Sequence, residues 1–269
     1  MDLTVTIFIV VVILVVFILI IQISKTKQSF RSKLLFHTNP KSKLAGKLAG
    51  KLAVVSYDNR STKEIELLKK VNQKYCAKHG YDFLFYHQYQ DEMTYPPYWL
   101  KVKIVQDVLK SNRYQYVMWM DSDACFHNDN QRIESLIPDT QTFFVKSSES
   151  GPHHFNAGIW LVQNSMMGHD FLRDWLVKYN ADNWDFQNGT WTCKINKYLN
   201  LESECAWSED QYEQGSGNRL LQTPKYKPFY HHVHGDVMQR QFPKPESFTV
   251  HFYLDAKKNI EYYVTKFNK

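Results

Sequence analysis

Apolar and polar positions follow two rhythms along the chain, one typical of strands and one typical of helices. Leu52–Tyr57 is a short, mostly apolar run that ends in polar residues, which predicts a buried strand. From Thr62 to His79 the apolar residues recur at steps of three and four, which predicts a helix. Gly80 follows directly and is expected to end it.

The same alternation continues through the middle of the chain. We expect further strands at 81–86, 116–120, 143–145 and 158–162, and further helices at 98–110 and 166–179. Strands that alternate with helices predict an α/β sheet with crossover connections, whose ligands bind beyond the carboxyl ends of the strands. The part after Asn180 is rich in Trp, Tyr and Asn and only weakly periodic, so we expect loops and short elements there.

An apolar run of membrane-spanning length precedes these elements. Residues 4–23 are almost entirely apolar, and about 20 helical residues span the roughly 30 Å hydrocarbon layer of a bilayer. A removable signal peptide fits less well, because no basic region precedes the run and no small-residue cleavage site follows it. We therefore predict a short tail at 1–3, a transmembrane signal anchor at 4–23, a basic stem at 24–51 and a folded domain at 52–269.

The charge of the chain is unevenly distributed. The formal net charge of +6 comes from residues 1–51, which hold eight Lys and Arg against one Asp. The remaining residues hold 25 Lys and Arg against 26 Asp and Glu, so the domain gives no indication of nucleic-acid binding. Basic residues that follow a span favour a cytosolic domain by the positive-inside rule.

Cysteines and glycosylation motifs leave the compartment open. The four cysteines lack metal-type spacing; they are Cys76, Cys125, Cys193 and Cys205. Cys193 and Cys205 are able to close a short loop if the domain is luminal, and free buried thiols are the alternative. Two N-glycosylation motifs, at Asn59 and Asn188, are compatible with a luminal domain but are common by chance.

Two aspartates at the end of a predicted strand are the sharpest chemical feature. Asp121 and Asp123 follow the apolar strand 116–120 and are separated by one residue, so in extended geometry they point to the same side. Two such carboxylates can hold a divalent cation, which in turn binds a diphosphate. The alternative is a helix cap. A phosphatase of the haloacid dehalogenase type is disfavoured, because Cys125 stands where a Thr or Val normally follows.

Three further motifs carry candidate chemistry, each with a plain structural alternative. Phe155–Gly158 is either a binding turn or an ordinary turn. The acidic residues and amide of Ser208–Gln211 are either catalytic groups or a helix start. His251 is either a metal ligand or a structural histidine. His231, His232 and His234 match no metal signature.

The order of these motifs resembles glycosyltransferase family 34. The shared blocks are YWLK at 98–101, WMDSDA at 119–124, FNAG at 155–158, a helix that contains 170–175, EDQ at 209–211 and HF at 251–252. The resemblance runs from about Leu52 to Lys258. It implies a GT-A fold, with a Rossmann-like nucleotide-binding half and an acceptor half on one sheet. It also implies a type II Golgi anchor with a luminal domain, a Mn²⁺-dependent nucleotide-sugar donor, and retention of anomeric configuration.

The resemblance also implies a role for individual residues. The metal ligands would be Asp121, Asp123 and His251, a mixed shell that suits Mn²⁺ better than Mg²⁺. The residues near the nucleotide and its phosphates would be Ser56, Arg60, Lys101, Asp121 and Lys257. The residues beside the transferred sugar would be Glu209, Asp210 and Gln211, with Asn156 and Gly158 at the donor or acceptor sugar. The family's His-Phe-x-Gly-Cys-Lys block reads HFYLDAK here, so either Lys257 or Lys258 takes the phosphate role.

These observations together predict a membrane-anchored, Mn²⁺-dependent retaining glycosyltransferase. It would move a hexosyl or pentosyl group from a UDP-sugar or GDP-mannose to a glycan hydroxyl, as a homo- or hetero-oligomer in a secretory-pathway membrane. A different GT-A family and a catalytically silent subunit of a glycosyltransferase complex are the alternatives. A silent subunit would be expected to lack a metal ligand, whereas all three candidates are present.

Overall fold

The computed structural model describes residues 48–138, 141–148, 150–194 and 207–267. The strands are β1 (Leu52–Tyr57), β2 (Asp82–Tyr86), β3 (Tyr116–Met120), β4 (Ala124–Phe126), β5 (Phe144–Ser148), β6 (Ile159–Gln163), β7 (Trp184–Gln187), β8 (Thr190–Cys193), β9 (Tyr230–His234) and β10 (Thr249–His251). The α-helices are α2 (Lys63–His79), α3 (Pro97–Lys110), α4 (Met166–Leu176), α6 (Glu213–Leu221), α7 (Gly235–Met238) and α8 (Ile260–Phe267). Short 3₁₀ helices are η1 (Ile133–Leu136), η2 (Ala181–Asn183), η4 (Lys227–Phe229) and η5 (Leu254–Asn259).

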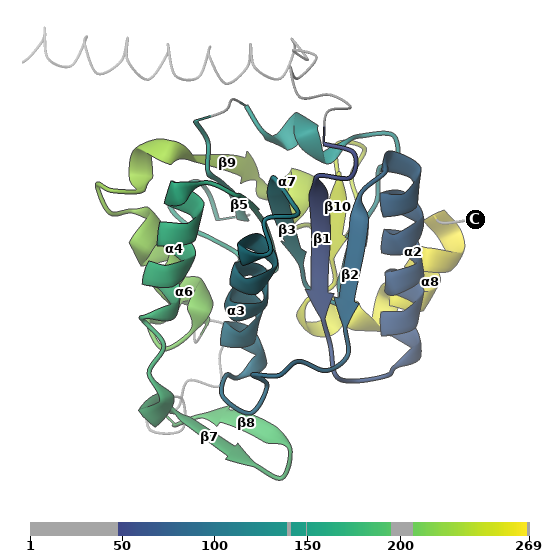
Figure 1. Ribbon diagram of the computed structural model, residues 1–269. Helices are drawn as coiled ribbons and strands as arrows, with labels where there is room; N and C mark the ends of the chain where they lie inside the picture. Colours follow the sequence, from purple (N-terminus) through teal and green to yellow (C-terminus); the bar gives the residue numbers. More distant parts are fainter. Residues whose placement is uncertain (1–47, 139–140, 149, 195–206, 268–269) are drawn as a thin grey trace, which may run out of the picture. The chain divides into compact units, whose positions relative to one another are not determined.

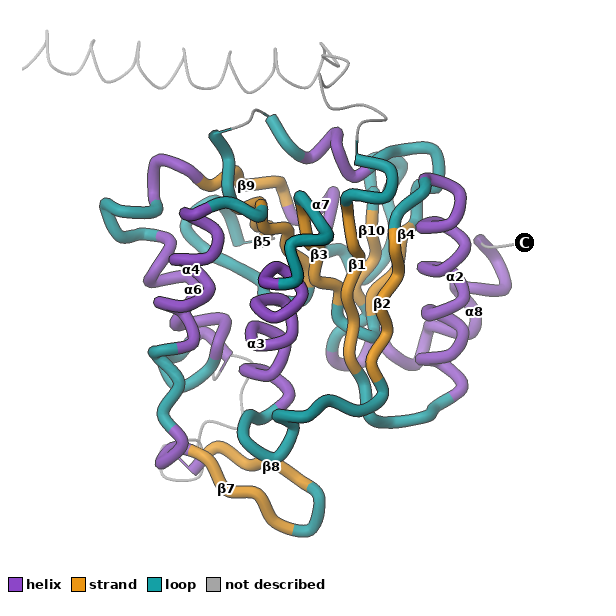
Figure 2. The backbone as a smooth tube through the Cα atoms, in the orientation of Figure 1, coloured by secondary structure: helices purple, strands orange, loops and turns teal. Residues whose placement is uncertain are grey.

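A six-stranded mixed sheet forms the centre of the domain, in the order β2-β1-β3-β6-β5-β9 (Figures 1 and 2). β6 runs antiparallel to both of its neighbours, and the other pairs are parallel. The carboxyl ends of β1, β2, β3, β5 and β9 therefore meet the beginning of β6 at one edge. The predicted α/β sheet is confirmed, with one reversed strand.

Alternate residues of the strands supply two hydrophobic layers. In β3, Val117 and Trp119 pack with the helices α3, α4 and α6, which lie on one side of the sheet in Figure 1. Tyr116, Met118 and Met120 point to the opposite layer, which includes side chains of α2, β4 and α7. This period of two on a fully buried strand is the reason that its sequence is apolar throughout.

In α2 the helix begins and ends where the sequence predicts. The Thr62 hydroxyl accepts a hydrogen bond from the Ile65 N–H at 3.4 Å, and this caps the first turn. Gly80 ends the helix with φ of 73°, in the left-handed region where a side chain is strained. α3 and α4 also lie where the apolar spacing predicts them, although α4 ends at Leu176, ahead of the predicted end.

Five short strands go beyond the elements that the pattern predicts: β4, β7, β8, β9 and β10. β4 and β10 form a separate antiparallel pair in which His251 lies opposite Ala124. β9 extends the main sheet beside β5. Four of these strands come from the part after Asn180, where only loops and short elements were expected, because short strands with few apolar residues carry too little alternation to be recognised.

The N-terminal predictions fall mostly outside the described residues. The anchor at 4–23 and nearly all of the stem at 24–51 belong there, as does Cys205. Within the described part of the chain, no helix is long and apolar enough to cross a membrane. Leu48 is fully buried in the layer around β1, so the folded part includes residues ahead of the predicted boundary at Leu52. Cys76, Cys125 and Cys193 are buried, and no disulfide joins them to one another in the described part of the chain.

Buried Asn72 joins α2 to the β4–β10 pair. Its Nδ2 donates to the Ala124 carbonyl at 3.0 Å, and its Oδ1 accepts from the Phe126 N–H at 3.1 Å. One amide thus satisfies both backbone groups of β4 that face the helix. The position of β4 matters because the two aspartates immediately precede it.

We predict that Asn72→Ala destabilises the fold. Two buried backbone groups lose their partners, at a cost of about 1–3 kcal/mol each. Urea unfolding of the full chain in detergent measures the loss, with Gln73→Ala, an exposed neighbour on the same helix, as the control. Equal midpoints for the two variants would contradict this role for Asn72.

Candidate active site

A cavity of about 900 Å³ opens at the edge of the sheet where the strands carry their carboxyl ends. Its walls come from the segments that follow β1 and β3, the turn before β6, the first turn of α6 and the end of β10. The lining residues there include Tyr57, Asp58, Arg60, Lys101, Asp121, Ser122, Asp123, Asn156, Gly158, Glu213, Gln214, His251 and Lys257. The cavity therefore lies where an α/β sheet binds its ligands.

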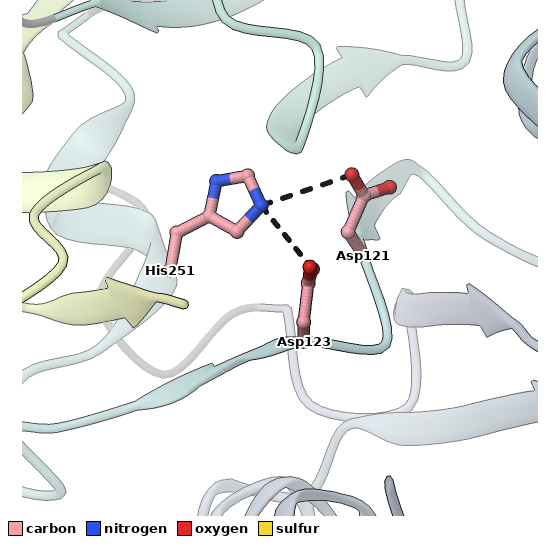
Figure 3. A group of neighbouring side chains, drawn as sticks. All are labelled: Asp121, Asp123 and His251. Atoms are coloured by element: carbon pink, nitrogen blue, oxygen red, sulfur yellow. Dashed lines mark ion pairs between the residues drawn. The ribbon is translucent and has the colours of Figure 1, made fainter. Parts of the chain in front are cut away.

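Asp121, Asp123 and His251 line this cavity, and Figure 3 shows that their side chains point toward one another. One ligand atom from each lies within 4.8 Å of the other two. The His251 Nε2 atom is 3.2 Å from Asp123 Oδ1 and 3.8 Å from Asp121 Oδ2. Carboxylate oxygens together with one imidazole nitrogen form a set that suits a divalent cation such as Mn²⁺. The sequence pattern pointed to the two aspartates and the family resemblance added His251, and the fold brings the three together from segments far apart in the chain.

A buried glutamine orients the His251 ring. Gln239 Nε2 donates to the carbonyl of Ile159 at 3.1 Å, so Gln239 Oε1 must face His251 Nδ1, at 2.9 Å. An amide oxygen only accepts, so this network assigns a proton to Nδ1. Nε2 is then the ring nitrogen that faces the aspartates and is left to coordinate a metal ion. Sequence reasoning missed Gln239, because a single Gln beside no motif carries no signal.

Gly158 makes room for the same ring. A Cβ atom on Gly158 would lie 2.1 Å from His251 Cε1, a distance that no side chain tolerates. The Gly158 carbonyl accepts from the Asp121 N–H at 2.8 Å, and the Gly158 N–H donates to Asn156 Oδ1 at 2.9 Å. The predicted sugar residues Asn156 and Gly158 both line the cavity, and both also support the metal ligands.

A buried lysine holds Asp121 in place. Lys101 Nζ donates to Asp121 Oδ1 at 2.9 Å and lies 3.3 Å from Glu213 Oε1. Burial alone lowers the pKa of an amine, but the two carboxylates outweigh burial and raise the pKa of Lys101. The indole N–H of Trp119 donates to the same Asp121 oxygen at 2.6 Å. Lys101 was assigned to the donor phosphates or ribose, and in this structure its amine is paired with these two carboxylates.

Asp123 is also held as an anion. Burial alone raises the pKa of its carboxyl, but the charges of His251 and Lys257 outweigh burial and bring that pKa below its usual range. Lys257 Nζ lies 3.0 Å from Asp123 Oδ2. Of the two lysines considered for phosphate, Lys257 lines the cavity, whereas Lys258 is not among its lining residues.

The two residues assigned to the nucleotide after β1 have different surroundings. Ser56 is buried within β1, at 1% exposure, and is not among the cavity-lining residues. Arg60 lines the cavity, and its guanidinium donates twice to the Asp58 carboxylate, at 2.8 and 2.7 Å. Asp58 also accepts from the Ser122 hydroxyl, which ties the end of β1 to the aspartate turn.

The acidic block at 209–211 lies outside the cavity lining. Asp210 is 73% exposed and pairs with Arg219, which also approaches Glu209. The Gln211 carbonyl accepts from the Trp99 indole at 2.8 Å, and its side-chain amide nitrogen is buried. These three residues, predicted beside the transferred sugar, are not among the cavity-lining residues.

Glu213 and Gln214 line the cavity instead. Burial raises the pKa of the Glu213 carboxyl in spite of Lys101, and its Oε2 has no hydrogen-bond partner among the described residues. Gln214 Oε1 accepts from the Ala157 N–H at 2.9 Å, which fixes its amide beside the FNAG turn. Sequence reasoning missed this pair, although its signal is present: the acid–Gln pair at 210–211 recurs three residues later, at the first turn of α6.

Comparisons with known proteins find similarity to glycosyltransferases. Residues 52–147 match the model of a family described as the galactosyl transferase GMA12/MNN10 family. The crystal structure of a glycosyltransferase involved in the glycosylation of the major capsid of PBCV-1 is similar, with a TM-score of 0.55 and 15% identity over 80% of this chain and 99% of that chain. Among curated proteins, none matches the chain.

Two more distant structures are also glycosyltransferases. GlyE of Streptococcus pneumoniae TIGR4 gives a TM-score of 0.44 and 13% identity over 76% of this chain and 55% of that chain. The apo-form of GlyE gives a TM-score of 0.43 and 13% identity over 80% of this chain and 64% of that chain. The likeness to the PBCV-1 enzyme shows a shared fold, and the family match covers β1 to β5 with both aspartates.

The geometry predicts that Gln239 controls metal affinity. Gln239→Leu removes the acceptor for His251 Nδ1–H, so the ring loses its orientation and Mn²⁺ affinity falls by about 10–100-fold. Gln239→Glu keeps an acceptor for His251 Nδ1–H and is expected to lose less Mn²⁺ affinity than Gln239→Leu. The free Mn²⁺ signal in electron paramagnetic resonance titrations measures affinity directly.

Gln241→Leu, two residues further along, is the matched control. Thermal unfolding of each variant separates a lost ligand orientation from a lost fold. Wild-type Mn²⁺ affinity in a folded Gln239→Leu protein would refute the orienting role.

Proposed function

We propose that the chain is a glycosyltransferase of the galactosyl transferase GMA12/MNN10 family, whose model it matches over residues 52–147, and that it moves a hexosyl or pentosyl group from a nucleotide-sugar to a glycan hydroxyl. The reaction depends on a divalent cation and retains the anomeric configuration. The observation that carries the proposal is the cluster of Asp121, Asp123 and His251 inside the cavity. A GT-A type of fold is part of the proposal.

The metal-binding end of the cavity is where the donor diphosphate would bind. Asp121, Asp123 and the Nε2 atom of His251 would hold Mn²⁺ or Mg²⁺, and the mixed ligand set favours Mn²⁺. When bound, the ion neutralises charge on the diphosphate and improves it as a leaving group. Arg60 and Lys257 supply positive charge at the same end. The chain thus offers both anionic ligands for the ion and cations for the phosphates.

The transferred sugar would lie between this end and the start of α6. The acceptor hydroxyl attacks the anomeric carbon on the same face from which the phosphate leaves. The bond between the anomeric carbon and the diphosphate oxygen breaks, and the departing phosphate takes the proton of the hydroxyl. Gln214 is placed to orient the sugar, and the Glu213 carboxylate, held by Lys101, stabilises positive charge at the anomeric carbon. Glu209, Asp210 and Gln211 remain proposed to assist from the adjoining loop.

The site supports a catalyst rather than a silent subunit. A subunit without turnover has no need for a complete ligand set, whereas Asp121, Asp123 and His251 converge with oriented side chains. We further propose that residues 4–23 anchor the protein in a secretory-pathway membrane as a single-pass type II protein with a luminal domain, acting alone or as a homo- or hetero-oligomer. UDP-sugars and GDP-mannose are the candidate donors.

Asp123→Asn is expected to abolish turnover while the fold persists. Loss of one anionic ligand removes several kcal/mol of transition-state stabilisation, which corresponds to a rate at least about 10³-fold lower. The measurement is Mn²⁺-dependent release of nucleoside diphosphate from UDP-xylose, UDP-galactose, UDP-glucose and GDP-mannose by the full chain in detergent, with EDTA as the metal-free arm.

Asp129→Asn, a change at an exposed aspartate that pairs with Lys78 and lies outside the cavity lining, controls for the loss of one carboxylate charge. Undiminished, EDTA-sensitive cleavage by Asp123→Asn would sink the metal-site assignment.

A further inference from the structure

The two ends of the cavity differ in chemistry. At the metal end lie the charged side chains already described. At the other end the walls come from the β7–β8 hairpin and from the loop between β2 and α3, and they present Met93, Phe186, Thr190 and Trp191. Met93 is 64% exposed and Phe186 is 36% exposed, so large apolar groups face open space beside a polar site. This second end has no part in the chemistry proposed above.

The hairpin is built to present one apolar face. Phe186 lies opposite Trp191 in the pairing of β7 with β8, as Trp184 lies opposite Cys193. Trp184 and Cys193 are buried, at 4% and 3% exposure, whereas Phe186 and Trp191 stay partly open. The face is therefore covered at its base and open toward the cavity.

Several contacts hold the hairpin in position before any ligand binds. The rings of Trp184 and Tyr212 are 5.1 Å apart, and the Trp191 indole N–H donates to the Glu92 carbonyl at 3.2 Å. Asn188 and Gly189 form the turn with φ of 51° and 77°, the conformation that an Asn-Gly hairpin turn adopts. Figure 1 shows the hairpin beside the N-terminal end of α3, beyond the carboxyl ends of β1 and β2. A fixed platform costs little ordering entropy on binding.

We propose that this hairpin is the binding platform for the acceptor, and that the acceptor presents a neutral sugar ring to it. The rings of Phe186 and Trp191, 4.9 Å apart, offer apolar surface to the C–H face of a pyranose, and Met93 adds apolar surface beside them. Glu92, on the same loop, carries a carboxylate that accepts from the Tyr57 hydroxyl at 2.9 Å. A carboxylate there disfavours a diphosphate, so the anionic donor is directed to the metal end and the neutral glycan to the hairpin. This inference rests on the proposed function.

The test compares two phenylalanines of similar exposure. Phe186→Ala removes a platform ring, whereas Phe229→Ala removes a ring that is 38% exposed and lies outside the cavity lining. The probes are UDP and GDP with Mn²⁺ for the donor end, and neutral tetrasaccharides of glucose, mannose and galactose for the acceptor end. Binding to the full chain in detergent is followed by isothermal titration for the nucleotides and by saturation-transfer NMR for the sugars.

We expect Phe186→Ala to weaken binding of the preferred tetrasaccharide by about 5–10-fold, the loss of one ring contact. Nucleotide affinity stays at the wild-type value in the same protein, and Phe229→Ala changes neither. Trp191→Phe, which keeps an aromatic ring, loses less tetrasaccharide affinity than Trp191→Ala.

Three results would overturn the platform while leaving the proposed function intact. The first is that Phe186→Ala binds the tetrasaccharide with wild-type affinity, and the second is that Phe186→Ala weakens nucleotide binding instead of sugar binding. The third is that the wild-type protein binds Mn²⁺–nucleotide but none of the tetrasaccharides. Wild-type protein that binds neither UDP nor GDP with Mn²⁺ would overturn the proposed function, and the platform with it.

Discussion

The short antiparallel pairing of β4 with β10 is the constraint on which the site depends. It places His251 opposite Ala124, directly beside the aspartate turn, although more than a hundred residues separate the two segments. The Phe252 N–H continues the pairing by donating to the Asp123 carbonyl at 2.8 Å. A slip of one residue would turn the imidazole away from the carboxylates. Asn72 helps to keep this register by bonding to β4, and Gly158 helps because it has no side chain that would displace the His251 ring.

Charge balance is the second condition for the site. Asp121, Asp123 and Glu213 lie together in a largely buried region, where three unpaired carboxylates would be costly. Lys101 pairs with Asp121 and Glu213 from within the core, and Lys257 pairs with Asp123 from the cavity side. Asp123 therefore stays ionised, and it can bind a cation without having to lose a proton. Ion pairs of this kind preserve the geometry of a site more than they stabilise a fold.

The sequence predicted best what depends on local pattern. β1, α2 and β3 are long and regular enough for their periodicity to be read, and the apolar strand before Asp121 places the aspartates at a sheet edge. His251 was assigned by resemblance, since a lone histidine carries no spacing of its own. Gln239, Glu213 and the β4–β10 pairing were not predicted, because their roles come from contacts between distant segments. Ser56 faces the core rather than the cavity, since alternate residues of a strand point to opposite sides.

Coordination of a divalent ion by Asp121, Asp123 and His251 is the central claim, and electron spin-echo spectroscopy of the Mn²⁺-loaded full chain tests it directly. The bound ion is expected to show coupling to one directly coordinated imidazole nitrogen, and His251→Gln should abolish that coupling while an exposed histidine variant, His234→Gln, retains it. Bound Mn²⁺ with no nitrogen coupling, or with a coupling that survives His251→Gln, would contradict the account.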